Sequence, residues 1–333
     1  MYRQVLGILA DGQRHTAKQL IEQLAINTAV LEQAIDTLSA YGIQFNSSVK
    51  NTYQLAESLE LLEHSLIQSG LSTETLSHLN DLDIFDVIES TNRYALDFKG
   101  VVPYICLAEY QTAGRGRQGR QWISPYASGL CLSIKYRYQI LNESLGGLNI
   151  ALAVTVVRVL QKLGVTEVGL KWPNDILWHN RKLAGLLLES RHGRDCDVVI
   201  GIGINVKMPL VDTTAITQTW VDLETILEQS ISRNTLAAML IEQCLQTLIH
   251  YPQLGLSAFH DDWHRFDLSY GQPVTLKIPS RSILNEEEKM ADTNFNSQMV
   301  MGTAYGIDEQ GALLLQVGDQ KQRYVCGEVS LRL

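Results

Sequence analysis

Residues 114 to 122 read G-R-G-R-Q-G-R-Q-W and combine two residue types that suit the binding of an anion. The guanidinium groups of Arg115, Arg117 and Arg120 are planar forks of donors that match the oxygens of phosphate and carboxylate groups. The glycines between them let the backbone bend closely around a ligand, because glycine has no Cβ atom. The pattern predicts a loop that closes over an anionic reaction intermediate.

The same segment also spells G-x-G-x-x-G, the fingerprint of a dinucleotide-binding turn. That fingerprint requires a helix directly after the third glycine. Here Gly119 is followed by R-Q-W-I-S-P-Y, in which Pro125 and the aromatic residues disfavour a helix start. A kinase glycine loop is disfavoured because the sequence has no H-R-D or D-F-G motif. An arginine-rich surface loop without a function stays open as the alternative to an anion-binding loop.

A second segment, K-W-P-N-D at residues 171 to 175, follows an apolar strand candidate at residues 168–170. A lysine at the end of an inner strand is costly to bury unless it meets an anion. Pro173 interrupts strand pairing, and Asn174 and Asp175 favour a tight turn. A plain turn between two strands is the alternative. Beside the arginine loop, the segment predicts a contact between Lys171 and an anion.

Three further segments have side chains or backbone suited to a ligand. Residues 181–185 precede a run of leucines, and the small Ala184 and Gly185 allow a ligand to approach the backbone of a strand. Residues 201–206 form a second strand relieved by glycine, and a plain core strand is the alternative for both. Residues 89–92 place polar side chains after a strand candidate, where Ser90 or Thr91 is expected to cap a helix.

The elements that must position these residues begin with a small helical module. Apolar residues recur at helical spacing in three stretches, Thr16 is expected to cap the second helix, and Asn27 precedes the third. Short strand candidates follow at 43–45 and 52–55. Three helices and a hairpin predict a winged helix-turn-helix, with Thr16 to Tyr41 as its DNA-binding part.

The polarity of the sequence and the spacing of its apolar residues change twice more along the chain. Residues 61–80 are polar and helix-capable, residues 81–268 alternate strands with helices, and residues 269–333 contain short strands and turns around a polar stretch at 279–297. We therefore expect an α/β multidomain chain: a module at 1–60, a connector, a central domain and a small β-barrel. The strands expected in the central domain are 84–88, 101–109, 130–136, 168–172, 175–178, 183–189 and 198–206, and the helices are 145–163 and 234–251. The strands expected in the barrel are 273–278, 299–307, 312–317 and 322–325.

Composition limits the location and the partners of the chain. The net charge of −9 argues against a general nucleic-acid binder, although a local basic patch stays open. No apolar run reaches the length of a membrane span, and the N-terminus lacks the apolar core of a signal peptide, so no membrane partner is expected. Five cysteines without a C-x-x-C pair are expected to be buried thiols of a cytoplasmic protein.

Taken in order, these motifs resemble the biotin protein ligases, in particular the longer bifunctional ligase–repressors of bacteria. The pair G-R-G-R-x-G-R and K-W-P-N-D is specific, and the resemblance runs from the N-terminal module to the C-terminus. The matching segments are 90–92, 109–111, 114–122, 171–175, 182–185, 201–205, 310–314 and 327–328. The resemblance implies a winged helix-turn-helix, a central mixed-sheet ligase domain at 81–268 and a C-terminal SH3-like β-barrel at 269–333.

The resemblance also implies a two-step reaction that uses ATP and Mg²⁺. The carboxylate of biotin attacks the α-phosphate of ATP and gives biotinyl-adenylate. A lysine of the biotin carboxyl carrier protein of acetyl-CoA carboxylase then displaces AMP. The implied catalytic residues are Lys171, Arg115 and Arg117, and Mg²⁺ arrives with ATP without an assigned protein ligand.

The resemblance assigns binding roles to residues that match the motifs of the family. The implied biotin-binding residues are Ser90, Thr91, Asn92, Gln111, Arg115, Gly116, Arg117, Lys171 and Gly185, with Lys182 to Gly185 as pocket wall. The implied ATP- and adenylate-binding residues are Arg115, Arg117, Arg120, Trp122, Lys171, Asn174, Asn205 and Trp220. For Trp220, core packing is the alternative to contact with the adenine ring.

The N-terminal module departs from the pattern of the ligase–repressors, whose module binds operator DNA as a ligand-linked homodimer. Residues 1–60 hold four basic and six acidic side chains. The expected recognition helix, residues 28–41, carries Glu32 and Asp36 but no lysine or arginine to contact phosphates. Two functions stay open: a ligase that is also a biotin-responsive repressor of the biotin operon, and a ligase whose module is structural or protein-binding. A lipoate-protein ligase, which shares the catalytic architecture, is a distant third.

Overall fold

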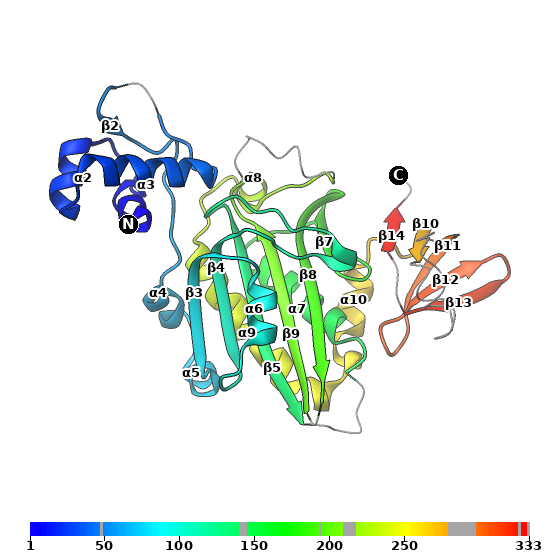
Figure 1. Ribbon diagram of the computed structural model, residues 1–333. Helices are drawn as coiled ribbons and strands as arrows, with labels where there is room; N and C mark the ends of the chain where they lie inside the picture. Colours follow the sequence, from blue (N-terminus) through cyan, green and yellow to red (C-terminus); the bar gives the residue numbers. More distant parts are fainter. Residues whose placement is uncertain are drawn as a thin grey trace, which may run out of the picture.

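The computed structural model describes residues 1–46, 49–139, 145–193, 195–208, 218–278, 298–325 and 328–331. Three regions follow one another: a helical N-terminal module, a large mixed sheet with helices on both faces, and a small antiparallel sheet (Figure 1). The polar stretch at 279–297, Cys326 and Gly327 lie outside the described residues.

The three predicted helices of the N-terminal module are present. They are α1 (Tyr2–Leu9), α2 (Ala17–Leu24) and α3 (Thr28–Ala40). Thr16 caps α2 as predicted: its hydroxyl accepts from the N–H of Gln19, whose side chain accepts from the N–H of Thr16. Asn27 caps α3 in the same way, by accepting from the N–H of Val30 at 3.0 Å.

The predicted hairpin of the module is confirmed in part, by an antiparallel bridge and two backbone hydrogen bonds that join residues 44–46 to residues 54–56. β2 (Thr52–Tyr53) pairs antiparallel with β1 (His15–Thr16), which the sequence did not indicate. Of the strand predicted at 43–45, Phe45 forms an isolated bridge with Leu55. β1 could not be predicted, because a strand of two residues shows no alternation of polar and apolar side chains.

The connector holds two short helices, α4 (His64–Ser69) and α5 (Thr73–His78), and its start is fixed to the central region. The N–H of Leu62 donates to Glu109 at 2.5 Å. The guanidinium of Arg233, 3% exposed, donates to the other Glu109 oxygen and to the carbonyl of Glu60, both at 2.7 Å. A buried ion pair therefore ties the chain that leaves the module to the central sheet.

Seven strands of the described chain form the central sheet, in the order β3-β4-β5-β9-β8-β7-β6. β3 and β4 are parallel, and the other neighbours are antiparallel. The bounds are β3 (Asp81–Ile88), β4 (Tyr104–Gln111), β5 (Gly129–Gln139), β6 (Val168–Lys171), β7 (Asp175–Trp178), β8 (Arg181–His192) and β9 (Asp195–Asn205). The predicted strands are thus confirmed, although the one predicted from residue 101 begins after Pro103, which has no N–H to donate.

Helices cover both faces of this sheet. On β4, Ile105 and Leu107 join the core made with α7 (Leu148–Lys162) and α9 (Arg233–Leu254). The alternate residues Tyr104 and Cys106 pack with Ala95 of α6 (Thr91–Asp97) on the other face. Both long helices were predicted from the sequence, whereas α6 was indicated by its cap alone. The remaining helices are α8 (Leu223–Leu227), α10 (His260–Phe266) and the 3₁₀ turns η1 (Arg117–Gly119) and η2 (Leu256–Phe259).

The described part of the third region is an antiparallel sheet in the order β13-β12-β11-β10-β14. Its strands are β10 (Pro273–Ile278), β11 (Gln298–Ile307), β12 (Leu313–Val317), β13 (Gln320–Tyr324) and β14 (Glu328–Leu331), of which the last was not predicted. Trp172 of the K-W-P-N-D segment is buried against this region, and its indole N–H donates to the carbonyl of Gly311 at 3.0 Å. The K-W-P-N-D segment therefore contacts the third region through Trp172, while Lys171 and Asp175 belong to strands of the central sheet.

Two composition-based expectations can be checked on the described residues. Cys106, Cys131, Cys196 and Cys244 are buried free thiols, as predicted. Within the described ranges, no helix combines the length and the apolar character that a membrane span requires.

Candidate active site

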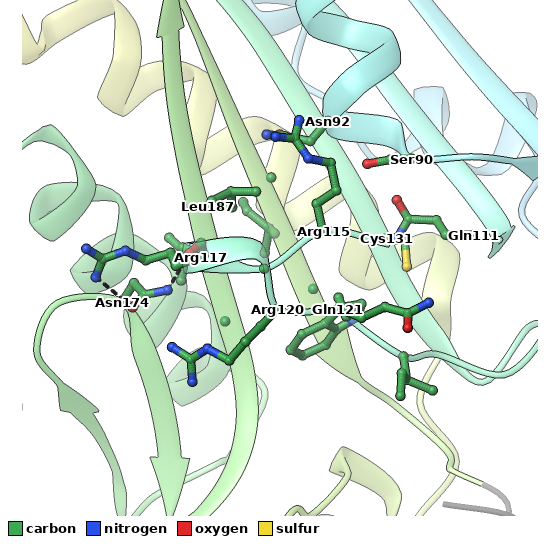
Figure 2. Close-up of a pocket in the computed structure, with 18 of the residues that line it drawn as sticks. Ser90, Asn92, Gln111, Arg115, Arg117, Arg120, Gln121, Cys131, Asn174 and Leu187 are labelled. Carbon is green, nitrogen blue, oxygen red and sulfur yellow. Dashed lines mark hydrogen bonds between the residues drawn. The ribbon is translucent and has the colours of Figure 1, made fainter. Parts of the chain in front are cut away.

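A pocket of about 410 Å³ lies on the α6 face of the central sheet, under the arginine loop (Figure 2). Its walls come from the loop between β4 and β5, the start of α6, the turn between β6 and β7, and strands β8 and β9. The predicted site residues that line it are Ser90, Thr91, Asn92, Gln111, Arg115, Gly116, Arg117, Arg120, Trp122, Asn174, Gly185, Asn205 and Trp220. The structure thus gathers segments that lie up to 130 positions apart in the sequence, from Ser90 to Trp220.

The pocket exists because β9 alternates isoleucine with glycine. Ile200, Ile202 and Ile204 point into the core beneath the sheet, so Gly201 and Gly203 face the pocket. A Cβ atom on Gly201 would lie 2.7 Å from Oδ1 of Asn92, and one on Gly203 would lie 2.4 Å from the ring of Trp122. Both glycines are therefore required by the side chains that stand over them.

The arginine loop is a compact turn and not the start of an α-helix. Arg115 and Gln121 form a bridge across it, Gln118 has a positive φ of 55°, and Arg120 returns to extended backbone. A Cβ on Gly114 would lie 2.3 Å from the carbonyl oxygen of Trp122, so the two ends of the loop approach as closely as glycine allows. The geometry confirms that the G-x-G-x-x-G spelling is not a dinucleotide fingerprint.

Arg115 is held at the polar end of the pocket by a carboxylate that lies outside the predicted motifs. Its two terminal nitrogens donate to Glu189 of β8 at 2.8 and 3.0 Å. The same carboxylate accepts from Nδ2 of the buried Asn92 at 2.5 Å. Arg115 is therefore a neutralised cation in this structure.

Hydrogen bonds continue from Asn92 across the floor of the pocket. The hydroxyl of Ser133 lies 3.3 Å from Oδ1 of Asn92 and 2.8 Å from Oγ1 of Thr91. The N–H and hydroxyl of Thr91 donate to Oε1 of Gln111 at 2.8 and 3.1 Å. Ser90 caps α6 as expected, by accepting from the N–H of Arg93, and also faces the pocket. This end of the pocket is buried, polar and uncharged apart from the neutralised pair.

Arg117 joins the loop to the K-W-P-N-D turn. Its guanidinium donates to Oδ1 of Asn174 at 3.3 Å, as Figure 2 shows, and Asn174 is fixed by donating to the carbonyl of Leu186 at 2.6 Å. Arg120 also lines the pocket and extends below Arg117, toward the same side of the view. The predicted proximity of the two motifs is confirmed.

The two lysines near this turn both contact a carboxylate of the protein. Lys171 and Lys182 both pair with the buried Asp175, at 3.3 and 2.7 Å. Among the described residues, Lys182 lines the pocket and Lys171 does not. Burial alone would raise the pKa of the Asp175 carboxyl, but Lys182 and Lys171 outweigh burial and hold that pKa below its ordinary value.

The opposite end of the pocket is aromatic. Trp122 packs on Gly203 and Gly185, with the Lys182 ammonium 5.6 Å from its ring centroid. Among the described residues its buried indole N–H has no hydrogen-bond partner. Trp220 forms a bridge with Lys182 and lines the pocket, so it is not packed wholly into the core. Asn205 is oriented by donating to the carbonyls of Lys182 and Val221 at 3.2 and 3.1 Å.

The described part of the chain offers no site of its own for a metal ion. Those residues contain no cluster of three or more histidine, cysteine or acidic side chains suited to a metal ion. The acidic group in the pocket, Asp175, is already shared by two lysines.

Some residues of the site could not be singled out from the sequence. Ser133, Cys131 and Gln121 lie in or beside the pocket but stand in stretches without a motif. Glu189 does have an indication in the sequence, because an acidic residue directly after a run of leucines in a predicted strand requires a cationic partner.

Comparisons with known proteins agree with this geometry. Residues 84–205 match the model of the biotin/lipoate A/B protein ligase family, and residues 295–332 match that of the biotin protein ligase C-terminal domain. The chain is 35% identical over 332 residues to the bifunctional ligase/repressor BirA of Escherichia coli strain K12, covering 98% of this chain and 96% of that protein. It is 31% identical over 266 residues to the biotin–[acetyl-CoA-carboxylase] ligase of Mycobacterium tuberculosis, covering 74% of this chain and 88% of that protein.

A solved structure shares the fold. The biotin protein ligase from Aquifex aeolicus, determined in complex with biotin and ATP, superposes with a TM-score of 0.60 at 24% identity, covering 76% of this chain and 99% of that one. The motifs, the pocket that they form and the full-length similarity lead to one conclusion: the chain belongs to the biotin protein ligase family.

Proposed function

We propose that this chain activates biotin with MgATP to biotinyl-adenylate and then transfers biotin to a lysine of a biotin carboxyl carrier domain of acetyl-CoA carboxylase. The observation that carries the proposal is the convergence, in one pocket, of a buried uncharged polar end with a cationic, aromatic end. A polar end of this kind suits the neutral ureido head of biotin. A cationic end suits a carboxylate that must react with a phosphate.

In the first step the biotin carboxylate oxygen forms a bond to the α-phosphorus, and the bond from that phosphorus to pyrophosphate breaks. Both reactants are anions, and negative charge builds up on the phosphorus. Lys182, Arg117 and Arg120 supply the positive field, because preorganised donors stabilise charge that develops in the transition state. We assign the contact with the reacting carboxylate and phosphate to Lys182, since Lys171 lies outside the pocket wall and helps to hold Asp175.

In the second step the Nζ atom of the carrier lysine attacks the acyl carbon. The bond from the acyl group to the phosphate breaks, AMP leaves, and the amine loses a proton. The ring of Trp220 and the indole N–H of Trp122, which has no hydrogen-bond partner among the described residues, form the nucleotide end of the pocket, and Asn205 at the end of β9 lines the same pocket. The magnesium ion is part of the MgATP substrate.

The other regions take roles by their position and similarity. We propose that residues 1–60 are a winged helix-turn-helix, residues 81–268 the ligase domain and residues 269–333 an SH3-like barrel, in a cytoplasmic protein that forms a ligand-linked homodimer. Similarity over the full length to a bifunctional ligase/repressor supports a second function for the module, operator binding. The acidic α3 supports the alternative of a ligase with a structural module.

The test is ATP-dependent transfer to a purified carrier domain. The full chain is incubated with the carrier, MgATP and either biotin or lipoate, and the modified lysine is identified by mass spectrometry. Omission of ATP and replacement of the carrier lysine by arginine are the controls. Transfer of lipoate in preference to biotin would identify the chain as a lipoate ligase.

A further inference from the structure

Glu189 touches both the arginine loop, through Arg115, and the buried polar end of the pocket, through Asn92. It stands on β8, whose neighbouring strands are β7 and β9. Its carboxylate uses one oxygen for Arg115 alone and shares the other between Arg115 and Asn92. The loop therefore rests on a rigid strand at this point.

The bidentate geometry determines what Arg115 does. A guanidinium that pairs through both terminal nitrogens with one carboxylate is fixed in orientation, and its positive charge is balanced. Arg115 is thus suited to hold the loop in place, whereas Arg117 and Arg120 on the same turn extend toward the cationic end of the pocket (Figure 2).

We propose that Glu189 is a positioning residue that anchors the arginine loop through Arg115 and couples this anchor to the biotin-head residues through Asn92. The coupling path is continuous: Arg115, Glu189, Asn92, Ser133, Thr91 and Gln111 are joined by hydrogen bonds. A head group that binds Asn92 fixes its amide, the amide fixes Glu189, and Glu189 keeps the loop closed over the reacting end. The coupling to a biotin head group rests on the proposed function, whereas the anchoring of the loop by Glu189 does not.

The anchor can be tested without any substrate, because the loop contains cleavage sites for trypsin. Glu189→Gln keeps the shape of the side chain and removes the charge that pairs with Arg115. We expect cleavage after Arg117 and Arg120 to become about five- to tenfold faster, the lower end of the effect of a charge-assisted pair, since Arg115 is 40% exposed. Arg115→Gln should have the same effect, and the double variant should be no faster than the faster single variant.

Arg137→Gln is the matched control. Arg137 of β5 makes a comparable bidentate pair with Asp197 of β9 on the same sheet, at 2.5 and 3.0 Å, away from the pocket. Cleavage in the loop should stay at the wild-type rate in this variant. Two results would contradict the anchoring role of Glu189. One is cleavage of Glu189→Gln at the wild-type rate, and the other is a double variant whose increase in rate is the product of the two single increases.

The coupling to the biotin end is read from kinetics of the full chain. In Glu189→Gln the KM for biotin and the release rate of biotinyl-adenylate should rise about five- to tenfold, while the single-turnover rate of adenylate formation at saturating biotin stays within about twofold. An unchanged KM with a lowered rate would contradict the coupling and make Glu189 part of the reacting end. A wild-type chain that forms no biotinyl-adenylate would refute the proposed function, and the cleavage result would still decide the anchor.

Discussion

The central residue-scale feature of the site is one buried carboxylate, Asp175, shared by two lysines. Two cations on one acid leave a net positive charge at this end of the pocket, while the lowered pKa of Asp175 keeps the acid ionised at neutral pH. Because Lys182 lines the pocket, its ammonium can move from Asp175 to an anionic substrate while Lys171 continues to neutralise the acid.

This arrangement predicts different outcomes for the two lysines. Lys182→Ala should reduce adenylate formation about 100-fold, a loss of about 3 kcal/mol of transition-state stabilisation. Lys171→Ala should retain adenylate formation within about fivefold and lower the free energy of unfolding by about 1–2 kcal/mol, since a buried acid loses one of its two partners. Pyrophosphate release and urea unfolding measure the two quantities. If folded Lys171→Ala is the inactive variant, the assignment from the sequence motif is correct and ours is wrong.

The sequence could indicate that both lysines lie near the pocket but not which one lines it. Lys171 stands in the more specific motif, which is why the motif favoured it. The direction in which the Lys182 side chain points is set by an irregularity in the pairing of β7 with β8. Ile176 pairs with Ala184, but the next residue, Leu177, pairs with Lys182, so that one residue of β8 is skipped. An extra residue in a strand turns the side chains that follow it, and such a bulge has no signature in this sequence.

At the scale of elements, the site depends on how β4 and the start of α9 are joined. Glu109, at the end of β4, precedes Tyr110 and the pocket residue Gln111. Arg233, the first residue of α9, holds Glu109 and the carbonyl of Glu60 inside the protein. The glycine–isoleucine alternation of β9 could be read as a strand from the sequence, but this ion pair could not, because its partners lie 124 positions apart.

Breaking this pair should destabilise the fold strongly. Arg233→Ala leaves the Glu109 carboxylate buried without its cation, so we expect a loss of about 3–5 kcal/mol in the free energy of unfolding. Arg158→Ala, which removes a partly exposed pair with Asp262, should lose about 1 kcal/mol or less. Denaturant titration of both variants makes the comparison, and equal losses would mean that the buried pair has no special weight.

At the scale of the whole molecule, the N-terminal module is packed on the ligase region. Tyr41, at the end of α3, lies 5.3 Å from Tyr110 and 6.0 Å from Tyr126, measured between ring centroids. The exposed face of α3 carries Glu32 and Asp36. The order of the three regions could be predicted from changes in sequence texture, whereas this packing could not, because single tyrosines in separate segments form no pattern.

The charge of the module predicts weak DNA binding. In a gel-shift assay with the upstream region of the biotin-synthesis operon at about 150 mM salt, we expect no sequence-specific shift with or without biotinyl-adenylate, because α3 offers no cation to the phosphates. Glu32→Lys with Asp36→Lys should introduce salt-sensitive, non-specific binding. A wild-type shift that requires biotinyl-adenylate would establish the repressor function.

The central claim is that the pocket joins biotin to the AMP part of ATP, with release of pyrophosphate, and then transfers biotin to a carrier lysine. The transfer reaction tests this claim most directly. The account predicts ATP-dependent modification of a single carrier lysine, one AMP and one pyrophosphate for each biotin attached, and at least about 100-fold slower transfer of lipoate, because the polar end of the pocket would be left unpaired by a dithiolane ring. Equal transfer of lipoate, or modification that does not need ATP, would contradict it.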